Sequence, residues 1–129
     1  ERVKHRQWFR PFAPSILREH VCDWFTRDID SPYMSFAIPF IKEKIDLVPA
    51  VVHFDGSARL QTVTKNDNEW YYNLISTFYK KTNVPILLNT SFNDREPIVE
   101  TPENAIKCFL GTDIDFLYFR DYKILVTRL

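Results

Sequence analysis

The sequence predicts an α/β fold of the α+β kind, with helices packed on a twisted, mixed and largely antiparallel sheet. Short apolar segments of strand length alternate with amphipathic segments of helix length along the chain. The 129 residues fit one domain, and 45% of them are hydrophobic, with 11 Phe, 6 Tyr and 3 Trp. This content is enough for a hydrophobic core and argues against disorder.

The chain begins with a basic stretch that runs into two prolines. Pro11 and Pro14 lie too close together for a helix, because each lacks a backbone donor and disfavours helical geometry in the residue before it. A short helix is expected to start at residue 15 or 17 and end at 25, where apolar residues recur every four positions. A strand is expected over residues 33–40.

The middle of the chain has the pattern of a β-hairpin. Strands over residues 51–54 and 58–63 flank Asp55 and Gly56, a pair that supplies the positive φ of tight hairpin turns. Arg59 follows the turn. Two interpretations remain open for it: a cation that enters a ligand pocket, or an exposed arginine beside a turn.

A long helix and a buried strand come next. The helix is expected over residues 66–82, with Asp67 as its N-cap and Asn83 ending it in a left-handed conformation. The strand is expected over residues 85–89. It ends in Asn89, Thr90, Ser91 and Asn93, which either bind a ligand beyond the strand or form an Asn- and Ser-rich turn.

The C-terminal part predicts one helix and two strands. Thr101 is the expected N-cap, with Pro102 at the first helical position and Gly111 after the end. Strands are expected over residues 116–119 and 124–126.

The composition excludes several classes of function. Seventeen basic residues balance seventeen acidic ones, so no basic excess indicates nucleic acid, and we expect no nucleic-acid partner. No apolar run reaches about 18 residues, so no membrane helix is expected. With only 2 Gly, the chain has no glycine-rich nucleotide loop, and side chains must hold any phosphate. Two cysteines and no signal peptide indicate reduced thiols in the cytoplasm.

The first candidate site is a basic cluster near the N-terminus. Its members, Arg2, Lys4, Arg6 and Arg10, offer ammonium and guanidinium donors that suit phosphate oxygens. The alternative is a solvated basic face, which is the usual role of a charge run. Arg10 lies between aromatic residues and Pro11, and this setting favours a functional role for it.

Three segments together resemble signatures of the carbamoyltransferase C-terminal domain, a family that includes NodU-type nodulation proteins and antibiotic O-carbamoyltransferases. The segments are residues 4–15 (KHRQWFRPFAPS), 49–63 (PAVVHFDGSARLQTV) and 88–93 (LNTSFN), the last followed by 96–99 (EPIV). Their order and spacing agree with the family, and the likeness covers essentially the whole chain. Three long motifs in register are far more specific than a single short pattern.

The resemblance implies a YrdC-like fold over residues 1–129, as one domain of a longer protein. The whole enzyme would also carry an N-terminal domain related to actin and sugar kinases, with an iron site. The C-terminal domain would bind ATP, together with Mg²⁺, and carbamoyl phosphate. It would form carbamoyl adenylate, from which the N-terminal domain passes the carbamoyl group to a hydroxyl of a natural product or sugar.

The site residues carry over from the family motifs. The resemblance assigns Lys4, Arg10, Arg59 and Ser91 to catalysis. It assigns substrate binding to a second set, which comprises Arg6, Ser15, Asp55, Asn89 and Asn93. The rival hypothesis is a non-catalytic module of YrdC-like shape, kept for assembly or for RNA binding. The presence of all four catalytic positions in one chain favours the enzyme.

Overall fold

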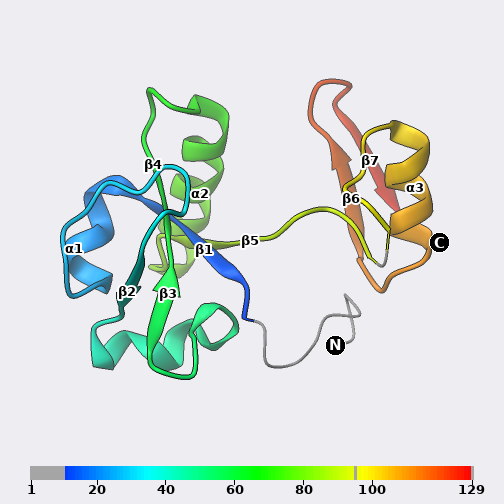
Figure 1. Ribbon diagram of the computed structural model, residues 1–129. Coiled ribbons are helices and arrows are strands. Elements are labelled where there is room, and N and C mark those ends of the chain that lie inside the picture. Colours follow the sequence, from blue (N-terminus) through cyan, green and yellow to red (C-terminus); the bar gives the residue numbers. More distant parts are fainter. Residues whose placement is uncertain (1–10, 95, 129) are drawn as a thin grey trace. The chain divides into compact units, whose positions relative to one another are not determined.

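The computed structural model of the chain describes residues 11–94 and 96–128 (Figure 1). These form two compact units. The first unit comprises residues 11–90, and the second unit comprises the described residues from Ser91 onward. Helices are present together with one parallel and several antiparallel strand pairs in the described residues, so the predicted α+β class is confirmed.

The first unit contains five strands and two α-helices. Its strands are β1 (Ala13–Leu17), β2 (Ala37–Pro39), β3 (Ser57–Arg59), β4 (Gln61–Val63) and β5 (Ile86–Asn89). Its helices are α1 (Val21–Trp24) and α2 (Glu69–Thr82), with the 3₁₀ turns η1 (Arg18–His20), η2 (Lys42–Leu47) and η3 (Pro49–Val51).

The strands of the first unit pair in two sheets. The larger sheet has the order β4-β1-β5, with β1 parallel to β4 and antiparallel to β5. The smaller one pairs β2 with β3 in antiparallel fashion. Because β1 is the central strand of the larger sheet, its side chains are covered on both faces, and Ser15, Ile16 and Leu17 are almost fully buried.

Each face of the larger sheet has its own hydrophobic cluster. Ile16 and Ile86 join a cluster with Phe25, whose ring stacks on that of Phe40 at 4.3 Å between centroids. Leu17 lies in the other cluster, with Ile75 of α2. Alternate residues of a strand point to opposite faces, so this division follows from the period of two. Helix α2 therefore covers the face that also carries Ser15.

Three elements of the first unit differ from the sequence predictions. Of the strand expected over residues 33–40, only β2 (Ala37–Pro39) forms. The helix expected from residue 15 or 17 to residue 25 was wrong at its start, where strand β1 forms instead. Of the expected range, only the four residues of α1 are α-helical. The expected 51–54 strand is absent, and residues 58–63 divide at Leu60 into β3 and β4. These two strands pair with β2 and β1, which are distant in the sequence.

Other elements match their predictions closely. Helix α2 ends at Asn83, whose φ of 58° is left-handed as expected. Its N-cap is Asn68 rather than Asp67, because the Asn68 side chain accepts a hydrogen bond from the backbone of Tyr71. Asp67 instead accepts from the Thr64 hydroxyl at 2.6 Å.

The second unit is a helix packed beside a two-stranded sheet (Figure 1). Thr101 caps α3 (Pro102–Leu110) as predicted, and β6 (Phe116–Phe119) pairs with β7 (Ile124–Thr127) in antiparallel fashion. Arg128 closes the C-terminal end of α3 by donating to the carbonyl of Phe109 at 2.8 Å and to that of Thr112.

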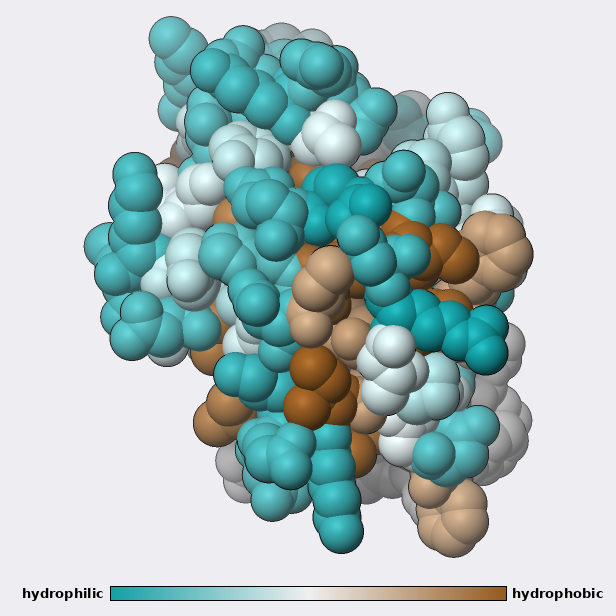
Figure 2. Space-filling model, turned by 90° about the vertical axis from the view of Figure 1, so that its left-hand side faces the viewer, coloured by the Kyte–Doolittle hydropathy of each residue, from teal (hydrophilic) through white to brown (hydrophobic). Residues whose placement is uncertain are grey.

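The surface of the first unit carries polar and charged side chains. The face shown in Figure 2 is largely hydrophilic, with hydrophobic residues confined to small patches. Arg18 contributes to this charged surface through ion pairs with Asp28 and Asp30. None of the helices in the described residues is both long enough and apolar enough to cross a membrane.

Candidate functional site

The structure distributes the predicted site residues over three parts of the chain. Lys4, Arg6 and Arg10 lie outside the described residues. A second group belongs to the first unit, namely Ser15, Asp55, Arg59 and Asn89. Ser91 and Asn93 belong to the second unit, so the boundary between the units falls inside the third signature.

A polar side-chain network spans the larger sheet of the first unit. The Gln61 side chain extends from β4, and its Oε1 accepts hydrogen bonds from Ser15 Oγ at 2.8 Å and Asn89 Nδ2 at 2.7 Å. Gln61 Nε2 donates to the Pro32 carbonyl at 3.1 Å. We call the three side chains of Ser15, Gln61 and Asn89 the amide bridge. It joins all three strands of the sheet on one face.

The register of the sheet explains why these three side chains meet. Ser15 is directly opposite Gln61 on one side, and two residues before it Ala13 is opposite Asn89 on the other. Facing residues, and those two apart on a strand, point to the same side of the sheet. The small Ser15 side chain leaves room above the central strand for the longer amides to meet.

Ser15 is the buried member of the bridge. It has no exposed surface, and its hydroxyl already donates to Gln61. The Tyr71 hydroxyl from α2 lies beside it; burial raises the pKa of Tyr71, and the Ser15 hydroxyl opposes part of that rise. The predicted contact of Ser15 with substrate stays a prediction, while its contact with Gln61 gives it a supporting role.

Arg59, the last residue of β3, is held outward by the residues before and after it. Ala58 and Leu60 on either side have no exposed surface, and alternation along the strand then places Arg59 on the solvent side. Within the described part of the chain, its guanidinium forms no ion pair or hydrogen bond. A free guanidinium on a rigid strand is well suited to bind an anion from solution.

The turn before β3 is fixed by Asp55. Its carboxylate accepts hydrogen bonds from the Ser57 hydroxyl at 2.7 Å and the Ser57 backbone N–H at 3.0 Å. These bonds to Ser57 lower the pKa of Asp55. Gly56 has a φ of +79°, the positive value that the sequence predicted for this turn. His53 Nδ1 lies 3.2 Å from the same Ser57 hydroxyl.

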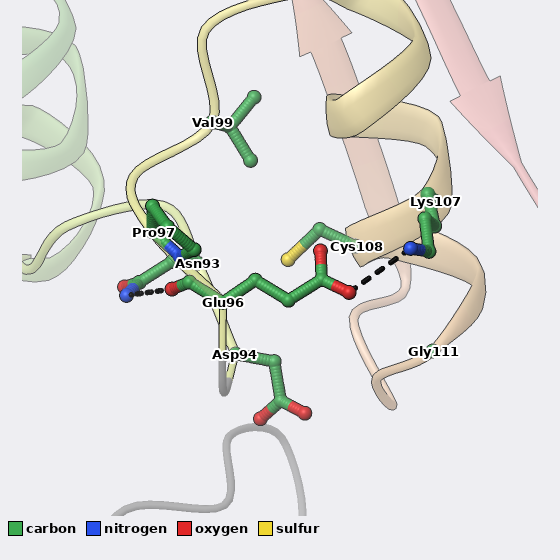
Figure 3. Close-up of a pocket in the computed structure, with 8 residues that line it drawn as sticks. All are labelled: Asn93, Asp94, Glu96, Pro97, Val99, Lys107, Cys108 and Gly111. Carbon is green, nitrogen blue, oxygen red and sulfur yellow. Dashed lines mark hydrogen bonds and ion pairs between the residues drawn. The ribbon is translucent and has the colours of Figure 1, made fainter.

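The second unit carries the remaining signature residues beside a cavity (Figure 3). Ser91 Oγ donates to Asn93 Oδ1 at 2.7 Å, and Asn93 Nδ2 donates to the Glu96 carbonyl at 2.9 Å. Asn93 lines the cavity, whose volume is about 290 Å³. The ion pair between Glu96 and Lys107, 3.0 Å long, crosses one side of it, and the Cys108 sulfur points inward.

Sequence reasoning missed Gln61. It lies inside the second signature, two positions after Arg59, and it interrupts the apolar pattern between Leu60 and Val63. A polar amide in a strand with buried neighbours needs hydrogen-bond partners, and this signal could have identified it. Among residues 11–94 and 96–128, no three His, Cys, Asp or Glu side chains gather as metal ligands.

Comparison with known proteins gives the same family along nearly the whole chain. The profile described as "Carbamoyltransferase C-terminus" matches residues 1–126. Nodulation protein NolNO of Sinorhizobium fredii is 48% identical over 127 residues, which cover 95% of this chain and 18% of that protein. Nodulation protein NolO of Bradyrhizobium diazoefficiens is 46% identical over 121 residues, covering 89% of this chain and 22% of that protein.

A cyanobacterial relative shows the same pattern of coverage. An uncharacterized protein of Synechocystis sp. is 40% identical in an alignment that covers 98% of this chain and 24% of that protein. The chain thus spans between about a sixth and a quarter of the length of these relatives. With a family profile that matches from residue 1 to residue 126, the chain belongs to the carbamoyltransferase C-terminus family.

Proposed function

We propose that this chain is the donor-activating part of an O-carbamoyltransferase, which binds carbamoyl phosphate and ATP and forms carbamoyl adenylate. The observation that carries the proposal is the family match over residues 1–126, in which all three signature segments lie. The likeness to NolNO and NolO supports it, since both belong to the curated relatives that align along most of this chain.

The reaction divides into three balanced steps. Water splits carbamoyl phosphate into carbamate and inorganic phosphate. A carbamate oxygen then attacks the α-phosphorus of ATP, and pyrophosphate leaves. Finally the acceptor hydroxyl attacks the carbamoyl carbon, AMP leaves, and the hydroxyl proton passes to water or to a base. The first two steps need placement of anions and neutralisation of charge more than acid–base chemistry.

Basic side chains would supply that neutralisation. Lys4, Arg10 and Arg59 are proposed to hold phosphate oxygens, with Arg6 nearby in the same segment as Lys4. Arg59 supports the proposal because its guanidinium is exposed on a strand whose neighbouring residues are fully buried.

Neutral polar side chains would orient the carbamoyl group. Ser91, Asn89 and Asn93 are proposed for this task, since hydroxyl and amide groups match a carbamoyl oxygen and nitrogen. Asp55 is proposed to hold the turn that leads into Arg59, through its two hydrogen bonds to Ser57.

The remaining parts of the reaction are assigned to other components. Mg²⁺ is proposed to accompany ATP and to neutralise phosphate charge. Acceptor recognition and an iron site are proposed for an actin- or sugar-kinase-like domain of the same protein, which works in the cytoplasm. The acceptor is proposed to be a small molecule with a free hydroxyl, such as a natural product or a sugar.

A calorimetric titration tests the proposal. The full-length protein that contains this chain is titrated with carbamoyl phosphate and then with ATP, as wild type and as Arg59→Ala. Arg27→Ala is the matched control, because Arg27 is also exposed in the first unit but lies outside all three signatures. We expect saturable binding that Arg59→Ala weakens at least tenfold and Arg27→Ala leaves unchanged. A folded wild-type protein that binds neither compound contradicts the proposal.

A further inference from the structure

The amide bridge has a defined direction of hydrogen bonding. It begins at the Pro32 carbonyl, a group that only accepts hydrogen bonds. The Gln61 amide nitrogen must therefore face Pro32, which turns Gln61 Oε1 toward Ser15 and Asn89. A flipped Gln61 would place its oxygen against the Pro32 carbonyl and lose that bond.

The same logic fixes the orientation of Asn89. Because Gln61 Oε1 is an acceptor, the Asn89 group that faces it must be the donor, Nδ2, at 2.7 Å. The Met34 sulfur lies 4.0 Å from the same nitrogen, as a second and weaker acceptor. The group that Asn89 has left for a ligand is its carbonyl oxygen, Oδ1. Within the described residues, no side chain or backbone N–H donates to this oxygen.

Asn89 is also placed where a ligand can reach it. It is the last residue of β5 and is half-buried, in contrast to Ser15, which is fully buried at the centre of the bridge. It opens the polar part of the third signature. Ligands of sheet proteins commonly bind beyond strand ends, where loops leave side chains accessible.

These observations assign a specificity role to the bridge. We propose that Asn89 Oδ1 accepts a hydrogen bond from the –NH₂ of the carbamoyl group, and that Gln61 is a positioning residue that keeps this acceptor turned toward the ligand. An acyl phosphate with a methyl group in place of –NH₂ has no hydrogen to donate there. The bridge thus selects carbamoyl phosphate over acetyl phosphate, a claim that rests on the proposed function above.

The preference has an expected size. One neutral hydrogen bond gained by the correct ligand, and left unmade by the wrong one, corresponds to about a tenfold difference in affinity. The phosphate group is common to both ligands, so its contacts cancel in the ratio of the two dissociation constants. That ratio therefore isolates the contact to –NH₂ from phosphate binding.

The experiment measures that ratio in the full-length protein for four variants. Asn89→Leu removes the acceptor with little change in volume, and Gln61→Met removes the group that orients it. Gln61→Glu keeps an acceptor oxygen toward Asn89 but sets its second oxygen against the Pro32 carbonyl, so it tests whether the bond to Pro32 is needed. Thr62→Val is the matched control, since the Thr62 hydroxyl is buried on the opposite face of β4, where it accepts from the Ser31 backbone at 2.9 Å.

We expect the wild type and Thr62→Val to prefer carbamoyl phosphate about tenfold over acetyl phosphate. Asn89→Leu and Gln61→Met should bring the ratio close to one while they retain phosphate-dependent binding, and Gln61→Glu should recover only part of the preference, because it loses the bond to the Pro32 carbonyl. Unchanged ratios in Asn89→Leu and Gln61→Met overturn the inference and leave the proposed function standing. A wild type that binds neither acyl phosphate overturns both the inference and the proposed function.

Discussion

Gln61 and Asn89 are joined by a hydrogen bond of 2.7 Å although their strands, β4 and β5, are not neighbours in the sheet. The bond passes over the central strand β1 at Ser15, which donates to the same oxygen at 2.8 Å. Neighbouring strands lie about 4.8 Å apart, so a bond across two spacings needs two long amides and a small residue between them. The size of Ser15 is thus as important as its hydroxyl.

Two substitutions at Ser15 separate its size from its hydrogen bond. Ser15→Ala keeps the space and loses one hydrogen bond, so we expect a loss of about 1 kcal/mol in the free energy of unfolding. Ser15→Val adds bulk at a site with no exposed surface, and we expect a loss of about 2–3 kcal/mol. Urea unfolding followed by circular dichroism measures both. Equal losses would contradict a role for the size of the residue.

The carboxyl group of Asp55 gives a pH-dependent contribution to stability. Its pKa lies below the ordinary value of 3.8 because the hydroxyl and N–H of Ser57 donate to the carboxylate. A depressed pKa stabilises the folded state above the ordinary value, and this contribution disappears as the pH falls through the depressed value.

Ser57→Ala tests this account of the turn. It removes the stronger donor and keeps the backbone N–H, so the pKa of Asp55 should rise but stay at or below its ordinary value. An NMR titration of the Asp55 carboxyl carbon measures the change. A pKa that does not move in Ser57→Ala would show that the hydroxyl is not the cause.

The N-cap of helix α2 gives a second test of local structure. Asn68 Oδ1 accepts from the Tyr71 backbone N–H at 3.0 Å, whereas the Asp67 carboxylate, among the described residues, bonds only to Thr64. We expect Asn68→Ala to lower the free energy of unfolding by about 1 kcal/mol. Asp67→Ala, as the paired control, should cost about half as much, since its contacts are exposed. Urea denaturation compares the two, and a larger loss in Asp67→Ala is the result that opposes this assignment.

The other end of α2 depends on a left-handed residue. Asn83 has a φ of 58°, and its backbone N–H donates to the Tyr79 carbonyl at 2.8 Å. A side chain with a Cβ but no polar group is strained there, so Asn83→Ala should lose about 1 kcal/mol relative to Asn83→Gly. Thermal unfolding of the two variants supplies the comparison. Equal midpoints would mean that the backbone changes its conformation in Asn83→Ala.

Local signals predicted the elements that depend on neighbours in the sequence. Thr101 and Asn83 cap the backbone through groups a few residues away, and both are found as expected. The Asp55-Gly56 pair also turns the chain, but not as part of the expected hairpin, because its first strand is absent. Helix α2 and the β6-β7 pair follow from their own patterns in the same way.

Pairing between distant segments was not predictable in this way. Residues 17, 21 and 25 are spaced as on one face of a helix, but they belong to different elements. Leu17 is in a strand, Val21 is in a short helix and Phe25 follows that helix. All three are buried, and burial alone produced the apparent pattern. Likewise, β4 pairs with β1, from which it is separated by more than 40 residues, and nothing within residues 58–63 specifies that partner.

The candidate site shows the same division. The signature segments led to Arg59 and Asn89, which carry groups suited to a ligand. Gln61 acts on another side chain rather than on a ligand, so its role became visible only when the fold brought β4 and β5 together across β1.

The proposed function of this chain is to activate a carbamoyl donor with ATP. Exchange of radiolabelled pyrophosphate into ATP by the full-length protein tests it most directly, because that exchange reports the reversible formation of an adenylate. We expect exchange that requires carbamoyl phosphate, falls at least tenfold in Arg59→Ala and persists in Arg27→Ala. Binding of carbamoyl phosphate without any exchange, or exchange that does not depend on carbamoyl phosphate, would contradict it.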